Sequence, residues 1–367
     1  MPESRLHKLS ALGQSVWIDY LARDLLHGGG LARKIEEDAV TGVTSNPTIF
    51  QKAISQGSAY DEQLRELLHH EDDEREIFVA LAGRDISEAC DLLRQSWDGG
   101  KGLRGYVSME VDPGLAYETD ATIEQARRFH QLIDRPNLYV KIPGTKTGLP
   151  AIEEMIASGK SINVTLIFSI ERHREVMEAY ISGLERLVES GGEPNHVASV
   201  ASYFVSRVDT EADKRLDAIG RADLKGKLAV ANAKLAYQSW REVFAGERWA
   251  ALEARGATKQ WCLWASTSTK NPDYPDTLYV DNLIGRDTVN TMPEETIEAF
   301  QDHGTVALTL EDGLDDARAL LDELAGAGVD YDDVTRVLEE EGVKKFSDSF
   351  DELLEGIRAK RGELVSA

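Results

Sequence analysis

Short apolar runs alternate with longer amphipathic segments along most of the chain. Segments such as 119–134 and 171–190 carry apolar residues at helical spacing, with charged residues on the opposite face. The apolar runs between such segments are typical of buried strands. These runs are 15–21, 40–46, 104–111, 138–143, 162–168, 197–204, 260–266 and 287–292. Alternating strands and helices predict a parallel sheet covered by helices.

The number of strand–helix units favours one particular α/β architecture. Eight units in 367 residues predict a closed (β/α)8 barrel, with an open doubly wound sheet as the alternative. An extra helical insertion, 223–256, lies between strands six and seven, and segments 315–328 and 349–364 predict C-terminal helices that close the barrel. Because no stretch is rich in Pro, Gly or Ser, we expect residues 1–367 to form a single domain.

Composition and charge limit the kinds of molecule that we expect the protein to bind. The chain is 42% hydrophobic, which is typical of a globular protein, and its formal net charge is −24 with no offsetting run of Lys or Arg. Nucleic acid and anionic membrane surfaces are therefore not expected partners. Cys90 and Cys262 fall in apolar patterns and predict buried free thiols. The N-terminus lacks an apolar core, and no run approaches the roughly 18 apolar residues of a membrane span, so we expect a cytoplasmic protein.

Two glycine-containing motifs do not fit the nucleotide sites that they resemble. Residues 100–105 match the dinucleotide fingerprint in letters, but that motif must follow a strand and open a helix, whereas here it precedes a strand. The "GKS" at 159–161 lacks the earlier glycine of a phosphate loop. No His or Cys residues show the spacing of metal ligands, so no metal site is expected.

Polar residues interrupt the apolar runs near the carboxyl ends of six consecutive strands. They are Asp19, Thr44, Ser45, Asn46, Glu110, Lys141, Asn163, Thr165 and Ser202. In a barrel these strand ends meet at one mouth, which is where active sites lie. Burying a charge costs several kcal/mol unless it is paired or neutralised. Two carboxylates and a lysine at one mouth therefore predict a functional site.

Lys141 is the most unusual of these residues. It lies in "YVKIPGT", 139–145, within an otherwise apolar strand. Burial among apolar side chains disfavours the ammonium and makes the neutral amine, a nucleophile for carbonyl groups, accessible. The alternative is a lysine that pairs with Asp19 or Glu110 for a purely structural purpose.

Six motifs, in order, resemble those of the transaldolase family, in its longer bacterial type. They are "GVTSNPTIF" (42–50), "VSMEVDP" (107–113), "YVKIPGT" (139–145), "INVTLIFS" (162–169), "SYFVSR" (202–207) and "LWAST" (263–267). The resemblance implies transfer of a dihydroxyacetone unit from sedoheptulose 7-phosphate to glyceraldehyde 3-phosphate. The products would be erythrose 4-phosphate and fructose 6-phosphate, as in the non-oxidative pentose phosphate pathway. It implies no cofactor, because the lysine serves as the electron sink.

The resemblance also implies roles for the residues at the mouth. Lys141 would form an imine with the ketose C2 carbonyl, and Asp19 would take the C4 hydroxyl proton during carbon–carbon cleavage. Glu110 would act as the acid of imine formation through a water oriented by Thr165.

Four further residues would contact the three-carbon unit. Asn46, Asn163 and Ser202 would hold its hydroxyl groups. Phe204 would form an apolar wall of the site, with an ordinary core aromatic as an equally good interpretation.

The phosphate site departs from the family pattern at one position. Arg207 matches the family's phosphate-binding arginine, and Ser266 matches a second contact. Ser268 stands where many members have another arginine. Lys270 would replace that arginine, the alternative being a solvated loop lysine.

Two other functions compete with a transferase. One is a lysine-dependent aldolase that releases free dihydroxyacetone, and the other is a non-catalytic barrel that binds sugar phosphates. In each case the expected partners are sugar phosphates, and the protein would be a monomer or a homodimer.

Overall fold

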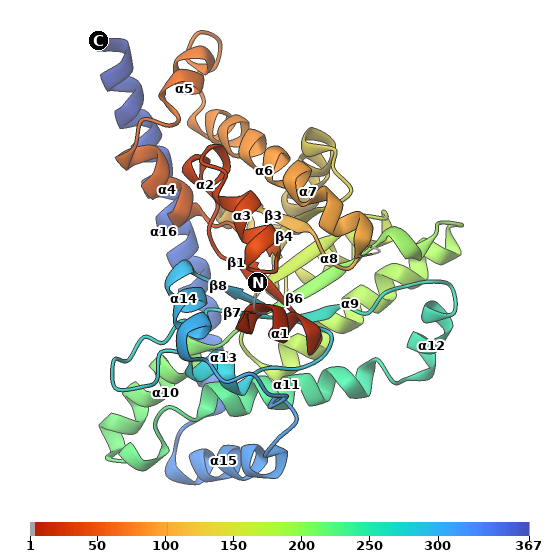
Figure 1. Cartoon of the computed structure of the whole chain (residues 1–367). Helices are drawn as coiled ribbons and strands as arrows, with labels where there is room; N and C mark the ends of the chain where they lie inside the picture. Colours follow the sequence, from red (N-terminus) through yellow and green to blue (C-terminus); the bar gives the residue numbers. More distant parts are fainter. Residues whose placement is uncertain (1–3, 101, 367) are drawn as a thin grey trace.

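A closed barrel of eight parallel strands forms the centre of the molecule (Figure 1). The computed structural model describes residues 4–100 and 102–366. The strands are β1 (Gln14–Ile18), β2 (Val40–Val43), β3 (Tyr106–Glu110), β4 (Leu138–Pro143), β5 (Ile162–Ile167), β6 (Ser199–Phe204), β7 (Trp261–Ala265) and β8 (Thr288–Met292). They follow one another around the barrel in sequence order, and β8 pairs with β1. The predicted (β/α)8 barrel is therefore confirmed, and the open sheet is excluded.

The predicted strands all exist, but the first two were predicted too long. β1 ends at Ile18 and β2 ends at Val43, so Asp19 and Asn46 lie in loops rather than in strands. Asn46 turns the chain directly into a helix, where its side chain accepts a hydrogen bond from the backbone N–H of Ile49. A polar residue that serves as an N-cap cannot also continue a strand.

Helices cover the outside of the barrel and fill its connections. The first half of the chain contributes α1 (Arg5–Ala11), α2 (Arg23–His27), α3 (Gly30–Glu37), α4 (Pro47–Gln56), α5 (Asp61–Leu67), α6 (Glu74–Gly99), α7 (Thr119–Ile133) and α8 (Leu149–Ala157). The second half contributes α9 (Ile170–Glu189), α10 (Ser206–Ile219), α11 (Leu228–Val243), α12 (Glu247–Glu253), α13 (Leu278–Asn282), α14 (Glu294–His303), α15 (Leu314–Ala327) and α16 (Tyr331–Ser366). Three short 3-10 turns are η1 (Pro113–Leu115), η2 (Pro194–His196) and η3 (Ala222–Leu224).

Two connections are much longer than a single helix. The predicted insertion at 223–256 is present as η3, α11 and α12, between β6 and β7. A second insertion, made of α4 and α5 ahead of α6, lies between β2 and β3 and was not predicted. Its helices are short, so their apolar period repeats too few times to stand out in the sequence.

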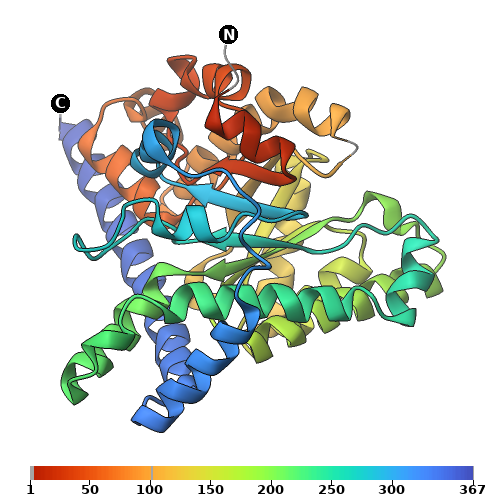
Figure 2. The same cartoon turned by 60° about the horizontal axis from the view of Figure 1, so that its bottom comes forward.

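The two predicted C-terminal helices are present, but they lie in different places. Helix α14 directly follows β8, while α15 lies beside α11 at the periphery (Figures 1 and 2). Helix α16 is 36 residues long, whereas the sequence predicted only its second half. It runs past α10 and β5 and then along α4 (Figure 1). Gly342 permits the close approach, because a Cβ there would lie 3.0 Å from the Leu166 side chain of β5.

Other predictions can be checked directly. Cys90 and Cys262 are buried free thiols, as expected. The glycine motif at 100–105 joins α6 to β3, with Gly100 as the C-cap of α6, and Lys101 lies outside the described residues. Within residues 4–100 and 102–366, no helix is long and apolar enough to cross a membrane.

Candidate active site

Strand register places three of the predicted residues at one level of the barrel. Glu110 of β3 lies beside Lys141 of β4, which in turn lies beside Asn163 of β5. Neighbouring residues in register on parallel strands point to the same side of the sheet. One step farther along, Pro143 lies beside Thr165. The barrel therefore brings together side chains that are far apart in the sequence.

Lys141 is buried and paired. Its Nζ donates to Glu110 Oε2 at 3.0 Å and to the backbone carbonyl of Ser45 at 3.3 Å. A carboxylate on the next strand therefore compensates the charge of Lys141. Of the two partners that the sequence offered, Asp19 and Glu110, the register between β3 and β4 selects Glu110.

Glu110 is as deeply buried as its partner. Burial raises the pKa of Glu110, while the charge of Lys141 and its hydrogen bond oppose that rise. Its second oxygen, Oε1, has no hydrogen-bond partner among the described residues. The carboxyl group can therefore exist in its protonated form and still has an oxygen to offer to a ligand.

Asp19 lies at the opposite side of the mouth, just beyond β1. Thr44 Oγ1 donates to Asp19 Oδ1 at 2.7 Å and is itself within 2.7 Å of Thr291 Oγ1 on β8. Burial raises the pKa of Asp19, and the hydrogen bond from Thr44, followed by the charges of Lys141 and other cations, counteracts it. Two carboxyl groups with differently built surroundings thus flank one amine, which is the arrangement that acid–base chemistry requires.

A chain of hydroxyl and amide groups lines the strands beyond Lys141. Ser202 Oγ donates to Asn163 Oδ1 at 2.7 Å, and Asn163 Nδ2 donates to Ser108 Oγ at 3.1 Å. Thr165 Oγ1 is buried and has no partner among the described residues. Leu166, the next residue, has a φ of 61°. This conformation is costly for a branched residue and is typical of backbone near functional sites.

Arg207 is a cation that lies against two neighbouring aromatic rings. Its Cζ lies 4.9 Å from the centre of the Phe204 ring and 5.8 Å from that of Phe346 in α16. Among the described residues, no carboxylate forms an ion pair with it, and Nη1 is buried without a partner. Burial lowers the pKa of Arg207, and Asp19 and Glu110 oppose this shift. A guanidinium with unused donors is suited to binding an anion.

The loop after β7 carries the other predicted phosphate contacts. Ser266 Oγ is 2.9 Å from Ser206 Oγ, next to Arg207, and the φ of Ser266 is 55°. Lys270 is exposed, and its Nζ donates to Ser268 Oγ at 2.6 Å. Its positive charge is among those that lower the pKa of Asp19.

A cleft of about 760 Å³ opens over this mouth. Asp19, Asn46, Arg207 and Phe346 form its inner wall, and Arg23 belongs to its outer wall. This volume accommodates a small organic ligand.

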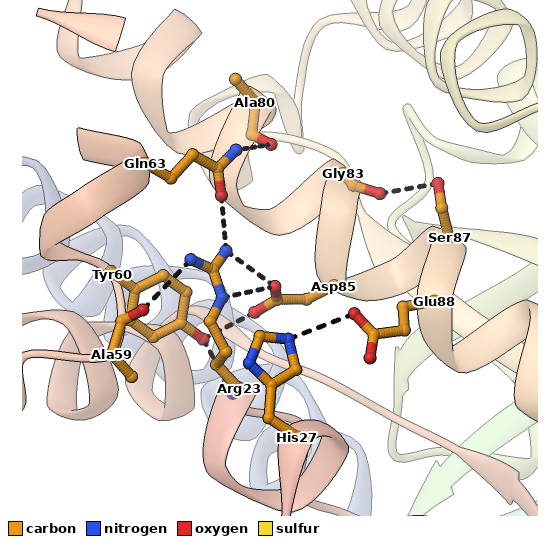
Figure 3. A network of polar contacts seen from close by, with 10 residues as sticks. All are labelled: Arg23, His27, Ala59, Tyr60, Gln63, Ala80, Gly83, Asp85, Ser87 and Glu88. Carbon is orange, nitrogen blue, oxygen red and sulfur yellow. Dashed lines mark hydrogen bonds and ion pairs between the residues drawn. The ribbon is translucent and has the colours of Figure 1, made fainter. Parts of the chain in front are cut away.

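Figure 3 shows how the outer wall is held. Arg23 of α2 donates from Nε and Nη2 to Asp85 Oδ1 of α6 at 3.0 and 2.9 Å, and its guanidinium stacks 4.1 Å from the centre of the Tyr60 ring. Tyr60 donates its hydroxyl to Asp85 Oδ2 at 2.7 Å, and Gln63 accepts from Arg23 at 2.6 Å. This buried network joins three helices beside the cleft.

Comparison with known proteins assigns the family. A family model described as "Transaldolase/Fructose-6-phosphate aldolase" matches residues 16–357. A protein named transaldolase from Parafrankia sp. (strain EAN1pec) is 52% identical over 98% of this chain and 99% of its own length. Transaldolases from Acidothermus cellulolyticus (52% identical, 97% of this chain and 99% of the relative) and Mycobacterium tuberculosis H37Rv (51%, 96% of both) are similar to the chain over comparable lengths.

The chain belongs to the transaldolase/fructose-6-phosphate aldolase family. It is therefore an enzyme, and its predicted family resemblance is confirmed. Within the part of the chain that the structure describes, no group of three His, Cys, Asp or Glu side chains could hold a metal ion.

Sequence reasoning about this family member missed most of the residues that line the cleft, among them Phe346 and Arg23. Phe346 comes from α16, more than 200 residues after Lys141, and Arg23 follows Asp19 in an ordinary helical stretch. The only signal for Phe346 was the pair of aromatics at 346 and 350, spaced as on one face of a helix.

Proposed function

We propose that this enzyme is a transaldolase that moves a dihydroxyacetone unit from one sugar phosphate to another through an imine on Lys141. The observation that carries the proposal is the buried Lys141–Glu110 pair, with Asp19 on the other side of the same mouth and an unpaired Arg207 in the cleft wall. The preferred substrates would be sedoheptulose 7-phosphate and glyceraldehyde 3-phosphate. Relatives over 50% identical are named transaldolase, which favours transfer over aldolase activity.

The pair supplies both groups that imine formation needs. Moving one proton over the 3.0 Å from Lys141 Nζ to Glu110 Oε2 gives a neutral amine and a protonated acid. A low-dielectric environment favours this uncharged pair. The amine adds to the ketose C2 carbonyl, and the acid donates the proton with which the carbinolamine hydroxyl leaves as water. Thr165 Oγ1, which has no protein partner among the described residues, is available to orient a water between them.

Cleavage of the C3–C4 bond uses the other carboxylate. The protonated imine accepts the electron pair of this bond and becomes an enamine. Asp19 takes the C4 hydroxyl proton, so that the departing fragment leaves as an aldehyde. Its hydrogen bond from Thr44 stabilises the ionised form that this role requires.

The remaining predicted residues would hold the substrate. Asn163 and Ser202, already joined by a hydrogen bond, line the strands next to Lys141 and would contact the hydroxyl groups of the three-carbon unit, together with Asn46. Arg207 would bind the phosphate group through its free donors, with Ser266 and Lys270 as further contacts.

The experiment is reduction of the imine by borohydride in the presence of fructose 6-phosphate. We expect one three-carbon adduct, mapped by peptide mass spectrometry to Lys141. Lys141→Arg should fold but form no adduct, because arginine remains protonated and cannot form the imine. Lys146→Met, at an exposed lysine five residues along, is the matched control and should label normally. An adduct on another lysine with Lys141 unmodified would exclude the mechanism.

Variants of the two carboxylates should behave differently in the same trapping assay. Asp19→Asn should still be trapped by borohydride but should not complete carbon–carbon cleavage, whereas Glu110→Gln should be trapped slowly. Each loss should be about 10²–10⁴-fold, the usual contribution of proton-transfer catalysis. Equal trapping rates in single turnover would contradict the division of roles.

A further inference from the structure

One aromatic ring of α16 faces both ends of the candidate active site. The Phe346 ring centre lies 5.7 Å from Lys141 Nζ and 5.8 Å from Arg207 Cζ, and the ring lines the cleft. Both distances are within the range of cation–π attraction. The ring is therefore close to both the nucleophile and the proposed phosphate anchor, in the wall of the cleft.

The position of this ring is fixed from both sides along its helix. One turn before it, Gly342 packs against Leu166 and Phe168 at the end of β5. One turn after it, the Phe350 ring centre lies 5.5 Å from that of Phe78 on α6. Helix α16 is therefore held at the mouth by contacts that do not involve the site itself, and Phe346 projects from it over Lys141.

We propose that Phe346 is a covering residue that keeps water from the Lys141 imine and thereby decides how much of the three-carbon unit is transferred rather than released. This inference rests on the proposed function. It identifies a residue outside the barrel strands that determines the ratio of transferred to released three-carbon unit. Phe346 lines the cleft beside Lys141 and is only 8% exposed, so its ring fills space next to the amine that water would otherwise occupy.

The reaction that Phe346 suppresses is hydrolysis of the intermediate. After cleavage, Asp19 holds the proton that it took from the C4 hydroxyl. The enamine takes this proton at C3 and becomes the iminium of dihydroxyacetone. Water then adds to C2, the carbinolamine collapses to the ketone, and the C–N bond breaks. The products are free dihydroxyacetone and the Lys141 ammonium. No oxidant or co-reactant other than water takes part. An apolar ring over the imine lowers the local concentration of that water.

The closing experiment measures the ratio of the two outcomes. Phe346→Ala, Phe346→Leu and the parent enzyme receive fructose 6-phosphate with erythrose 4-phosphate, and both sedoheptulose 7-phosphate and free dihydroxyacetone are quantified. Phe350→Ala is the matched control, because Phe350 lies on the same helix and is similarly buried (5% exposed) but packs on Phe78. Borohydride trapping at Lys141 is run on every variant.

We expect Phe346→Ala to raise the ratio of released to transferred product at least about tenfold, which corresponds to about 1.4 kcal/mol in relative barriers. Phe346→Leu, which keeps most of the apolar cover, should raise it less. Phe350→Ala removes one contact that positions α16 but leaves the Phe346 ring present, so it should raise the ratio less than Phe346→Ala does. If Phe346→Ala fails to fold, the test rests on Phe346→Leu alone. A covering role then requires a higher ratio of released to transferred product in Phe346→Leu than in the parent enzyme.

The inference is overturned if the ratio in the Phe346 variants equals that of the parent, or if Phe350→Ala changes it equally. Both results leave the adduct on Lys141, so they do not affect the proposed function. Loss of the Lys141 adduct in the parent enzyme would instead reject the proposed function itself.

Discussion

Replacing Asp85 by asparagine should strongly destabilise the protein, because it leaves the buried Arg23 guanidinium without a counter-charge. Asp85 is 0% exposed and accepts three hydrogen bonds, two from Arg23 and one from Tyr60. Burial raises the pKa of Asp85, and the hydrogen bond from Tyr60 and the charge of Arg23 counteract that rise. An asparagine has one acceptor oxygen for these donors and adds an NH₂ group that also needs an acceptor.

The magnitude follows from the burial of the pair. Removing one partner of a buried ion pair typically costs about 3–5 kcal/mol. Glu88→Gln is the matched control on the same two helices, since Glu88 pairs with His27 of α2 at 3.3 Å but is 38% exposed (Figure 3). An exposed pair of this kind contributes up to about 1 kcal/mol.

The assay is urea unfolding followed by far-ultraviolet circular dichroism, with the free energy of unfolding compared among variants. A third variant, Arg23→Met with Asp85→Leu, removes both charges and should recover much of the loss, because no unpaired charge remains buried. A cost for Asp85→Asn no larger than that of Glu88→Gln would refute the reasoning. So would a double variant as unstable as Asp85→Asn.

Three further predictions concern the region of α10 and the loop after β7. Burial raises the pKa of Asp209 to about 7, above the unfolded value of about 3.9, so the folded state holds this proton more tightly and stability falls as pH rises from about 4 to 7. Asp209→Asn should make this fall smaller when unfolding free energies at pH 5 and pH 8 are compared, although other buried carboxyl groups with raised pKa values, such as Asp85, still contribute; a fall of unchanged size would contradict the prediction. Lys270→Ala should reduce kcat/KM for fructose 6-phosphate by roughly 10- to 150-fold, the equivalent of about 1.5–3 kcal/mol, while kcat/KM for unphosphorylated fructose stays within about twofold. A change below about twofold for both substrates would mean that Lys270 does not contact phosphate. Gly226→Ala should lower the unfolding midpoint, because Gly226 has a φ of 70° and a Cβ there would lie 2.7 Å from the Tyr274 ring. An unchanged midpoint would contradict this prediction, because the loop would then accommodate the added methyl group without cost.

The pattern of the chain predicted the barrel because each strand is specified locally. β4 was predicted at its observed bounds, 138–143, since an apolar run ends there at Pro143 and Gly144. Lys141, Glu110 and Asn163 were found because polar side chains in buried strands are rare enough to stand out. Helix α16 was predicted only in part, since its first half shows a weaker apolar pattern and its path past α10 and α4 depends on contacts with distant elements.

By itself, the sequence determined the order of strands and helices, the polar residues at the strand ends and the family. These features depend on local period and on side-chain identity at single positions. Only the tertiary structure decided that Lys141 pairs with Glu110, that Arg207 lies against two aromatic rings, and that the Phe346 ring lies near Lys141. Each of these contacts joins residues on different elements. Their partners are therefore fixed by strand register and helix packing, which are properties of the whole chain.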